Sequence, residues 1–113
     1  MRYTTAMNRN FQFRRMYRSA ASRANSYLVL YYRKNKGKEN HLGITVSKKV
    51  GTAVVRNRVR RLIKENYRLY EEQILQGYDL VIVARVKAAE ADFYQIRHSL
   101  LSLLSSCGLN KQS

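Results

Sequence analysis

The sequence of 113 residues contains no proline, no internal repeat and no low-complexity tract, and nothing in it resembles an interdomain linker. Its single cysteine, Cys107, excludes a disulfide or a cysteine-based metal site within one chain. No apolar run approaches the ~20 residues of a membrane-spanning helix, and the N-terminal MRYTTAMNRN lacks the apolar stretch of a signal peptide. We therefore expect one cytoplasmic domain over residues 1–113, with flexible ends at about residues 1–8 and 108–113.

Acidic residues are also scarce. Seven Asp and Glu residues stand against 22 Lys and Arg residues, which gives a net charge of +15 at pH 7. Residues 1–70 hold 18 of the basic residues and only two acids, Glu39 and Glu65, whereas residues 71–113 are nearly neutral. Such an imbalance destabilises a fold by self-repulsion and is usually compensated by a polyanion. We expect the polyanion-facing surface to come from the first 70 residues.

The few acids do not form a catalytic pattern. The sequence shows no pair of carboxylates of the kind that supports metal-dependent phosphodiester chemistry. His41 and His98 are isolated in the sequence, and nothing near Cys107 supports a Cys–His nucleophile pair. The sequence thus predicts neither a catalytic residue nor a dedicated metal site on this chain.

Helical and strand patterns alternate along the chain. Helical spacing of apolar residues is found in residues 9–19, 53–75 and 89–106. Strand patterns are found in residues 26–33, 41–48 and 78–85. Thr52 is a candidate N-cap for the second helix, and the charged segment 34–40 reads as a hairpin loop or an excursion. The order α-β-β-α-β-α, with room for one more short strand near 34–41, predicts a mixed α+β fold.

On a helical wheel, residues 54–75 separate into two faces. The apolar face carries Val55, Val59, Leu62, Ile63, Leu69, Tyr70 and Ile74. The opposite face carries Asn57, Arg60, Arg61, Lys64 and Arg68, with Arg56 and Arg58 at its borders. A solvated helix face normally mixes charges to gain pairs worth ~0.2–0.5 kcal/mol each, yet Glu65 is the single acid between Lys48 and Tyr70. We interpret this face as a polyanion-binding surface, since the planar fork of arginine suits phosphate.

Aromatic residues interleave with arginines in the segment 11–32. They are Phe11, Phe13, Tyr17, Tyr27, Tyr31 and Tyr32. Two interpretations remain open at this point. The rings either belong to the core or form a stacking platform for single-stranded nucleic acid, where each stacked base contributes ~1–3 kcal/mol.

The segment GITVSKKVGTAVVRNRVRRLIKE (43–65) resembles the signature of the protein subunit of bacterial ribonuclease P, which is close to SxSKKxGNAVxRNRxKRxxRE. The helix with Phe13 and Tyr17, the strand ending in Tyr31 and the DLVIVAR strand follow the order of that family. Two positions differ from it. Thr52 stands where the family usually has Asn, and Ala20 stands where Gly is usual after the first helix.

The resemblance implies a single-domain α+β fold, a two-layer sandwich with a mixed central sheet and a left-handed strand–helix–strand crossover that contains the R-N-R helix. That hand is opposite to the one that general physics favours. The resemblance also implies a non-catalytic subunit of an endoribonuclease, in which an RNA subunit uses Mg²⁺ to remove the 5′ leader from precursor tRNA.

The site residues of the family transfer by position. The helix that meets the catalytic RNA carries Arg56, Asn57, Arg58, Arg60, Arg61 and Lys64, with Arg68 on the same face. The cleft for the single-stranded 5′ leader carries Phe13, Tyr17 and Tyr31, with Thr45, Ser47, Lys48 and Lys49 at its edge. The implied partners are the RNA subunit and precursor tRNA, without a membrane or an obligate protein partner. Composition alone leaves three alternatives: a ribosomal-type RNA-binding protein, a dimeric DNA-binding protein and an autonomous nuclease.

Overall fold

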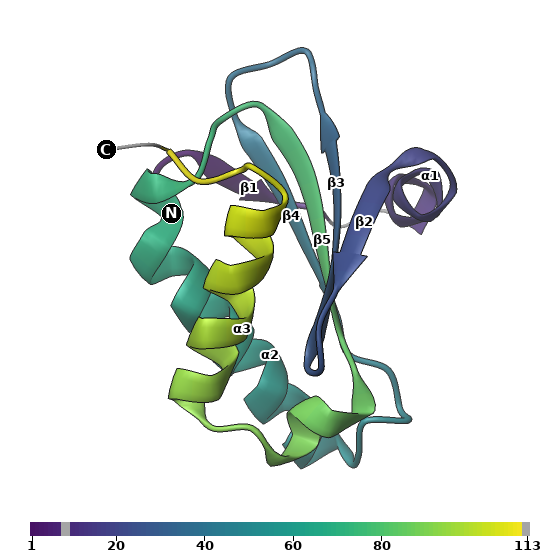
Figure 1. The fold of residues 1–113 in the computed structure, drawn as a ribbon. Helices are drawn as coiled ribbons and strands as arrows, with labels where there is room; N and C mark the ends of the chain where they lie inside the picture. The colour runs from purple at the N-terminus through teal and green to yellow at the C-terminus, as the bar shows by residue number, and fades with distance from the viewer. Residues whose placement is uncertain (8–9, 112–113) are drawn as a thin grey trace.

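A five-stranded mixed sheet forms the centre of the protein, with helices on both of its faces (Figure 1). The structure is a computed structural model that describes residues 1–7 and 10–111. The strands are β1 (Thr4–Ala6), β2 (Ala21–Ala24), β3 (Leu28–Lys34), β4 (Asn40–Thr45) and β5 (Tyr78–Ala84). The helices are α1 (Asn10–Ser19), α2 (Ala53–Tyr70) and α3 (Phe93–Ser106), with 3₁₀ turns at Glu71–Gln73 and Val86–Glu90. No helix in these described ranges is long and apolar enough to cross a membrane.

The strand order is β1-β4-β5-β3-β2, so that β5 lies between β3 and β4. It pairs in parallel with β4 and antiparallel with β3. The hairpin interpretation of residues 34–40 is therefore wrong, and the segment is an excursion that passes from one side of β5 to the other. Residues 35–39 form no strand. The most continuously apolar strand takes the centre because its residues are buried on both faces of the sheet.

Two short edge strands were not predicted. β1 pairs in parallel with β4, and β2 pairs antiparallel with β3. Neither has an alternating apolar pattern, and all four residues of β2 are exposed. Both are ordered by their pairing partners rather than by burial of their own side chains.

The described parts of the chain ends make contacts with the rest of the fold, and their flexibility stays a prediction. The carboxylate of Glu71 accepts hydrogen bonds from the backbone N–H groups of Arg2 (2.8 Å) and Tyr3 (3.1 Å), which holds β1 beside α2. At the other end, Leu109 is buried and Asn110 forms an isolated β-bridge with Ile74. The remainder of the expected flexible ends, residues 8, 112 and 113, lies outside the described residues.

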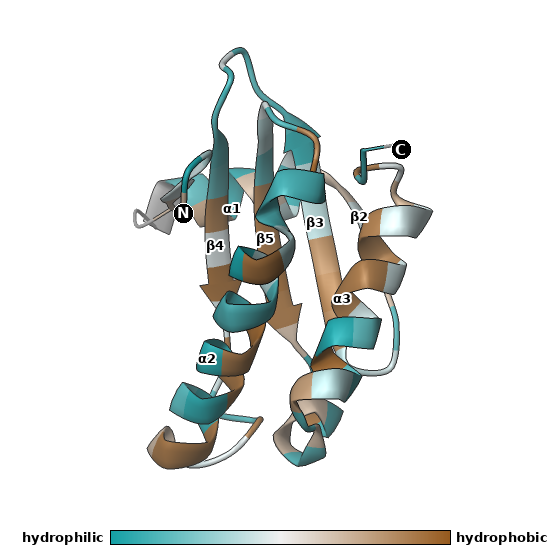
Figure 2. Cartoon of the chain, turned by 90° about the vertical axis from the view of Figure 1, so that its left-hand side faces the viewer, coloured by the Kyte–Doolittle hydropathy of each residue, from teal (hydrophilic) through white to brown (hydrophobic). Residues whose placement is uncertain are grey.

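The connection from β4 through α2 to β5 is left-handed. Viewed from the side of α2 and α3 with both strands running downwards, β5 lies to the right of β4 (Figure 2). This is the hand that the family resemblance implied and the opposite of the common one.

Helices α2 and α3 form the helical layer of the predicted sandwich, and α1 covers part of the opposite face (Figure 1). The larger core cluster lies between the sheet and α2 and α3. A smaller cluster under α1 contains Met7, Met16 and Val81, with Phe13 and Tyr31 packed against it. The last helix begins at Phe93 instead of residue 89, because Asp92 and Gln95 form a capping box at that point.

Candidate nucleic-acid interface

The N-terminus of α2 is fixed by the residues that the sequence singled out. The backbone of Thr52 is extended, and its hydroxyl accepts a hydrogen bond from the N–H of Val55 at 3.4 Å. Threonine therefore caps the helix in place of the asparagine that is usual in the family pattern. Alanine at position 20 is also accommodated, because Ala20 does not adopt a positive φ.

The apolar face of α2 is shorter than predicted. Val59 and Ile63 are fully buried, as expected, whereas Leu69 is 53% exposed and is not part of the core. The helix ends at Tyr70, and Ile74 is buried from an extended position after the 3₁₀ turn. Asn66 and Tyr67 are fully buried although they were not predicted to be. The buried arc is thus rotated away from Leu69 towards Tyr67, a rotation that depends on where α3 and β1 pack.

The predicted cationic face divides into internal and outward-facing side chains. Arg58 donates to the backbone carbonyls of Ala91 (2.7 Å) and Ala89 (3.5 Å), so it ties α2 to the turn before α3. Arg56 donates through Nε to the carbonyl of Gly51 at 3.2 Å. These two arginines at the borders of the face are half-buried and partly used in structural contacts.

The centre of the face points to solvent. Asn57, Arg61, Lys64 and Arg68 are exposed, and Arg60 is half-buried. Arg60 donates to the side chain of Asn57 at 2.9 Å, and Arg68 pairs with Glu65 at 3.2 Å. No ion pair within the described part of the chain involves Arg61 or Lys64. The structure therefore brings the predicted RNA-facing residues of α2 together on one surface. On this surface, Arg61 and Lys64 are the cations whose charge is least compensated by the described residues.

The aromatic residues of α1 border a groove on β4. The rings of Tyr17 and Tyr31 meet edge-on with centroids 5.0 Å apart, and the hydroxyls of Tyr17 and Thr45 lie 3.1 Å apart. A groove of about 380 Å³ is lined by Phe13, Tyr17, Ile44, Thr45, Val46 and Arg60. The predicted leader residues Phe13, Tyr17 and Thr45 thus line one groove, and Tyr31 supports it through Tyr17.

The edge residues and the other aromatics are placed differently. Ser47, Lys48 and Lys49 are exposed in the turn that directly follows the groove residue Val46. Tyr27 and Tyr32 pack against the core on the α2 side, so they are not platform residues. The side chain of Phe11 lies outside the described part of the structure. The core interpretation therefore applies to Tyr27 and Tyr32, and the platform interpretation stays a prediction for Phe13 and Tyr17.

Arg60 was assigned only to the helix face, but it belongs to both surfaces. It lies on the cationic side of α2 and also lines the groove beside Phe13 and Tyr17. A second cavity of about 230 Å³ lies between β1, β4 and α2, and there Arg60 is joined by Lys64. No local pattern could reveal this role, because it depends on the angle at which α2 crosses β4.

Comparison with known proteins identifies the family of this chain. The family model described as Ribonuclease P matches residues 1–108. The chain belongs to the ribonuclease P protein family. The ribonuclease P protein component of Clostridioides difficile (strain 630) is 49% identical over 102 residues, which cover 89% of this chain and 90% of that protein. That of Clostridium botulinum (strain Langeland) is 47% identical over 104 residues, which cover 91% of this chain and 94% of that protein.

Solved ribonuclease P proteins have the same fold. The Staphylococcus aureus RNase P protein superposes with a TM-score of 0.86 at 36% identity, covering 92% of this chain and 95% of that one. The RNase P protein from Thermotoga maritima superposes with a TM-score of 0.77 at 33% identity, covering 87% of this chain and 91% of that one. The left-handed crossover and the R-N-R helix thus stand in a chain whose whole architecture matches the ribonuclease P proteins.

One pair of polar residues in this ribonuclease P family member was not predicted. His41, which looked isolated in the sequence, lies 2.7 Å through Nδ1 from the carboxylate of Asp79. The two residues are 38 positions apart and meet because β4 and β5 are paired in the sheet. The described residues include no group of three or more His, Cys, Asp or Glu side chains placed to hold a metal ion.

Proposed function

We propose that this chain is the protein subunit of a ribonuclease P ribonucleoprotein that removes the 5′ leader from precursor tRNA. The observation that carries the proposal is the junction at Arg60 between the cationic face of α2 and the aromatic groove on β4. In a chain of this family, the α2 face docks on the catalytic RNA, and the groove holds the unpaired nucleotides of the leader.

Charge and shape support this division of roles. Arg61 and Lys64 are exposed and form no ion pair among the described residues, so their charge can neutralise phosphates and release counterions irrespective of sequence. Tyr17 is 44% exposed at the groove and presents a ring on which a base can stack. Because the substrate and the catalytic RNA are both negative, a subunit of charge +15 placed between them lowers their repulsion. The subunit should therefore improve substrate affinity and reduce the Mg²⁺ that the RNA requires.

The residues of this chain do not fit a resident Mg²⁺ site at the proposed interface. Mg²⁺ is usually held by one or two carboxylates together with phosphates and water. None of the described residues that line the groove on β4 carries a carboxylate, and the single acid on α2, Glu65, is paired with Arg68. Mg²⁺ belongs to the RNA subunit in this proposal, where it supports cleavage of the phosphodiester. This chain contributes binding and positioning.

Reconstitution tests the proposal. The full chain is combined with a bacterial ribonuclease P RNA, and precursor tRNA cleavage is measured at low Mg²⁺. We expect faster cleavage and tighter substrate binding than with the RNA alone. Absence of stimulation would overturn the assignment, and cleavage by the protein without an RNA subunit would overturn the division of roles. Binding to duplex DNA in preference to RNA would favour the DNA-binding alternative instead.

A further inference from the structure

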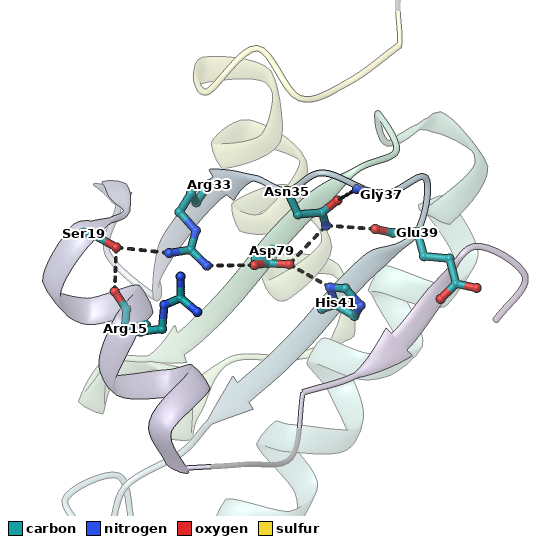
Figure 3. Close-up of polar contacts among 8 residues, drawn as sticks. All are labelled: Arg15, Ser19, Arg33, Asn35, Gly37, Glu39, His41 and Asp79. Carbon is teal, nitrogen blue, oxygen red and sulfur yellow. Dashed lines mark hydrogen bonds and ion pairs between the residues drawn. The ribbon is translucent and has the colours of Figure 1, made fainter.

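Another cavity, distinct from the groove and from the cavity between β1, β4 and α2, lies on the same face of the sheet as the groove, at the opposite end of β4. It has a volume of about 150 Å³ and is lined by Met7, Gln12, Arg15, Arg33, Asn35, His41 and Asp79. The register places His41, Asp79 and Arg33 in one row across β4, β5 and β3. Figure 3 shows Arg15 reaching from α1 towards this row. We call this cavity the Arg15 pocket.

Among the described residues that line the pocket, Asp79 is the only acid, and both of its carboxylate oxygens already accept hydrogen bonds. Oδ1 accepts from His41 Nδ1 (2.7 Å) and from the side chain of Asn35 (3.1 Å), and Oδ2 accepts from Arg33 at 3.1 Å (Figure 3). Burial alone would raise the pKa of Asp79, but the hydrogen bonds from His41, Asn35 and Arg33 outweigh it and hold the pKa below its ordinary value. The group is therefore an ionised carboxylate that accepts three hydrogen bonds from its neighbours.

The pocket keeps a surplus of positive charge. The other terminal nitrogen of Arg33 donates to the hydroxyl of Ser19 at 3.3 Å, and that hydroxyl donates to the carbonyl of Arg15. Within the described residues, no acceptor is paired with the guanidinium of Arg15 (Figure 3). Two guanidinium groups thus face one cavity against a single carboxylate. Two positive groups that line one cavity repel each other, and one carboxylate compensates only half of their charge.

We propose that the Arg15 pocket binds a phosphate group of RNA. The volume is about ten times the ~10–15 Å³ that one enclosed water requires, which accommodates a phosphate with part of its hydration shell. Arginine forks match phosphate oxygens in geometry and charge. Because an ionised Asp79 can only accept, His41 donates from Nδ1, and Nε2 remains for a further partner.

The position of the pocket indicates which phosphate it takes. His41 and Thr45 face the same side of β4 four residues apart, or about 13 Å at ~3.3 Å per residue. Helix α1 crosses the strands between the two sites, with Phe13 and Tyr17 on its groove side and Arg15 on its pocket side (Figure 1). A single strand of several nucleotides that leaves the groove and passes around α1 would place a backbone phosphate in the pocket. The assignment to the leader rests on the proposed function, whereas the phosphate site itself does not.

The free protein provides the first test. The full chain, labelled for NMR, is titrated with inorganic phosphate, and the ring signals of His41 and the Nε signals of arginine are followed. We expect saturable shifts at His41 and Arg15 and an affinity about tenfold lower in Arg15→Gln, the scale of one lost charge-assisted hydrogen bond. Arg14→Gln is the matched control, because it removes the same charge from an exposed residue of α1 that does not line the pocket. Equal effects of both variants, or shifts confined to α2, would overturn the site.

The reconstituted holoenzyme provides the second test, with precursor tRNAs of increasing leader length and with mature tRNA. We expect Arg15→Gln to weaken binding only of substrates whose leader extends beyond the groove, and Arg14→Gln to leave all of them nearly unchanged. Equal losses for mature tRNA and for long leaders would overturn the leader assignment and identify the RNA subunit as the source of the phosphate. Failure of the wild-type protein to stimulate cleavage would contradict the proposed function, without affecting the phosphate titration.

Discussion

The hydroxyl of Tyr17 lies 3.1 Å from the hydroxyl of Thr45, so that a hydrogen bond joins α1 to β4 beside the groove. The same tyrosine meets the ring of Tyr31 edge-on. Tyr17 is therefore held on two sides while 44% of its surface stays exposed. A ring fixed in this way loses little entropy when a base stacks on it, which is the property required of a binding platform.

Tyr17→Ala should weaken binding of precursor tRNA to the holoenzyme by about 1–3 kcal/mol, the range of one stacked base. Binding of mature tRNA should change much less, because it has no leader to stack. Tyr17→Phe is the matched control, since it keeps the ring and removes only the hydrogen bond to Thr45. Dissociation constants of both substrates give the comparison. Equal losses for the two tRNAs in Tyr17→Ala would mean that the ring only supports the fold.

Two arginines of the R-N-R helix should respond in different ways to truncation. Arg61→Ala should lower the slope of log K against log salt by about 1 for association with the RNA subunit, as expected for one lost phosphate contact. Arg58→Ala should instead destabilise the free protein, since Arg58 donates to the carbonyls of Ala89 and Ala91. The cost should be roughly 1–3 kcal/mol, because both carbonyls lose a charged donor.

Salt titrations of RNA binding and denaturant unfolding separate the two effects. Arg97→Ala, on α3, controls for loss of one arginine away from α2. An unchanged salt slope for Arg61→Ala would place this residue away from the RNA.

Local pattern predicted the elements that bury their own side chains. The apolar alternation of β4, the buried strand β5 and the cap at Thr52 all follow from short-range rules. It failed for β1, which has the sequence TTA and gains its order from β4 and from Glu71. The position of β5 between β3 and β4 could not be predicted either, because strand periodicity does not indicate which strands are neighbours in the sheet.

The candidate site was predictable to a similar extent. The cationic face of α2 follows from helical periodicity within one segment, and the groove residues came from resemblance to a family. The Arg15 pocket brings together α1, β3, β4 and β5, and its central contact joins residues 38 positions apart. Such a site is a property of the sheet register, and no single segment of the sequence contains its pattern.

Gly43→Ala should disturb the groove by displacing the ring of Phe13. A Cβ at Gly43 would lie 2.6 Å from the ring of Phe13, which is closer than van der Waals contact allows. The ring and α1 must move, at a cost of about 1–3 kcal/mol in folding stability, as for other overpacked cores. Gly37→Ala is the control, because its nearest neighbour would lie at an ordinary 3.5 Å. Equal unfolding free energies of the two variants would show that Phe13 moves aside freely.

Acid should release β1 from α2 before the sheet unfolds. Burial alone would raise the pKa of Glu71, but hydrogen bonds from the side chain of Thr4 and from the N–H groups of Arg2 and Tyr3 lower it below its ordinary value. A carboxyl with a lowered folded pKa stabilises the fold fully above the unfolded pKa of ~4.3, and this contribution is lost as pH falls through the folded pKa. Hydrogen exchange of the backbone N–H of Met7, which bonds the carbonyl of Leu42, should therefore quicken below about pH 4 relative to its intrinsic rate.

Glu71→Gln separates this effect from general acid unfolding. The variant keeps one acceptor oxygen but cannot titrate, so protection of the Met7 N–H should be weaker at neutral pH and nearly constant as pH falls towards 4. The matched control is Glu72→Gln, because Glu72 is exposed and makes a single surface ion pair with Arg2. It should behave like the wild type. If Glu71→Gln kept the pH dependence of the wild type, the release of β1 would have to come from another acid, of which Asp79, two strands away from β1, is the next buried carboxylate.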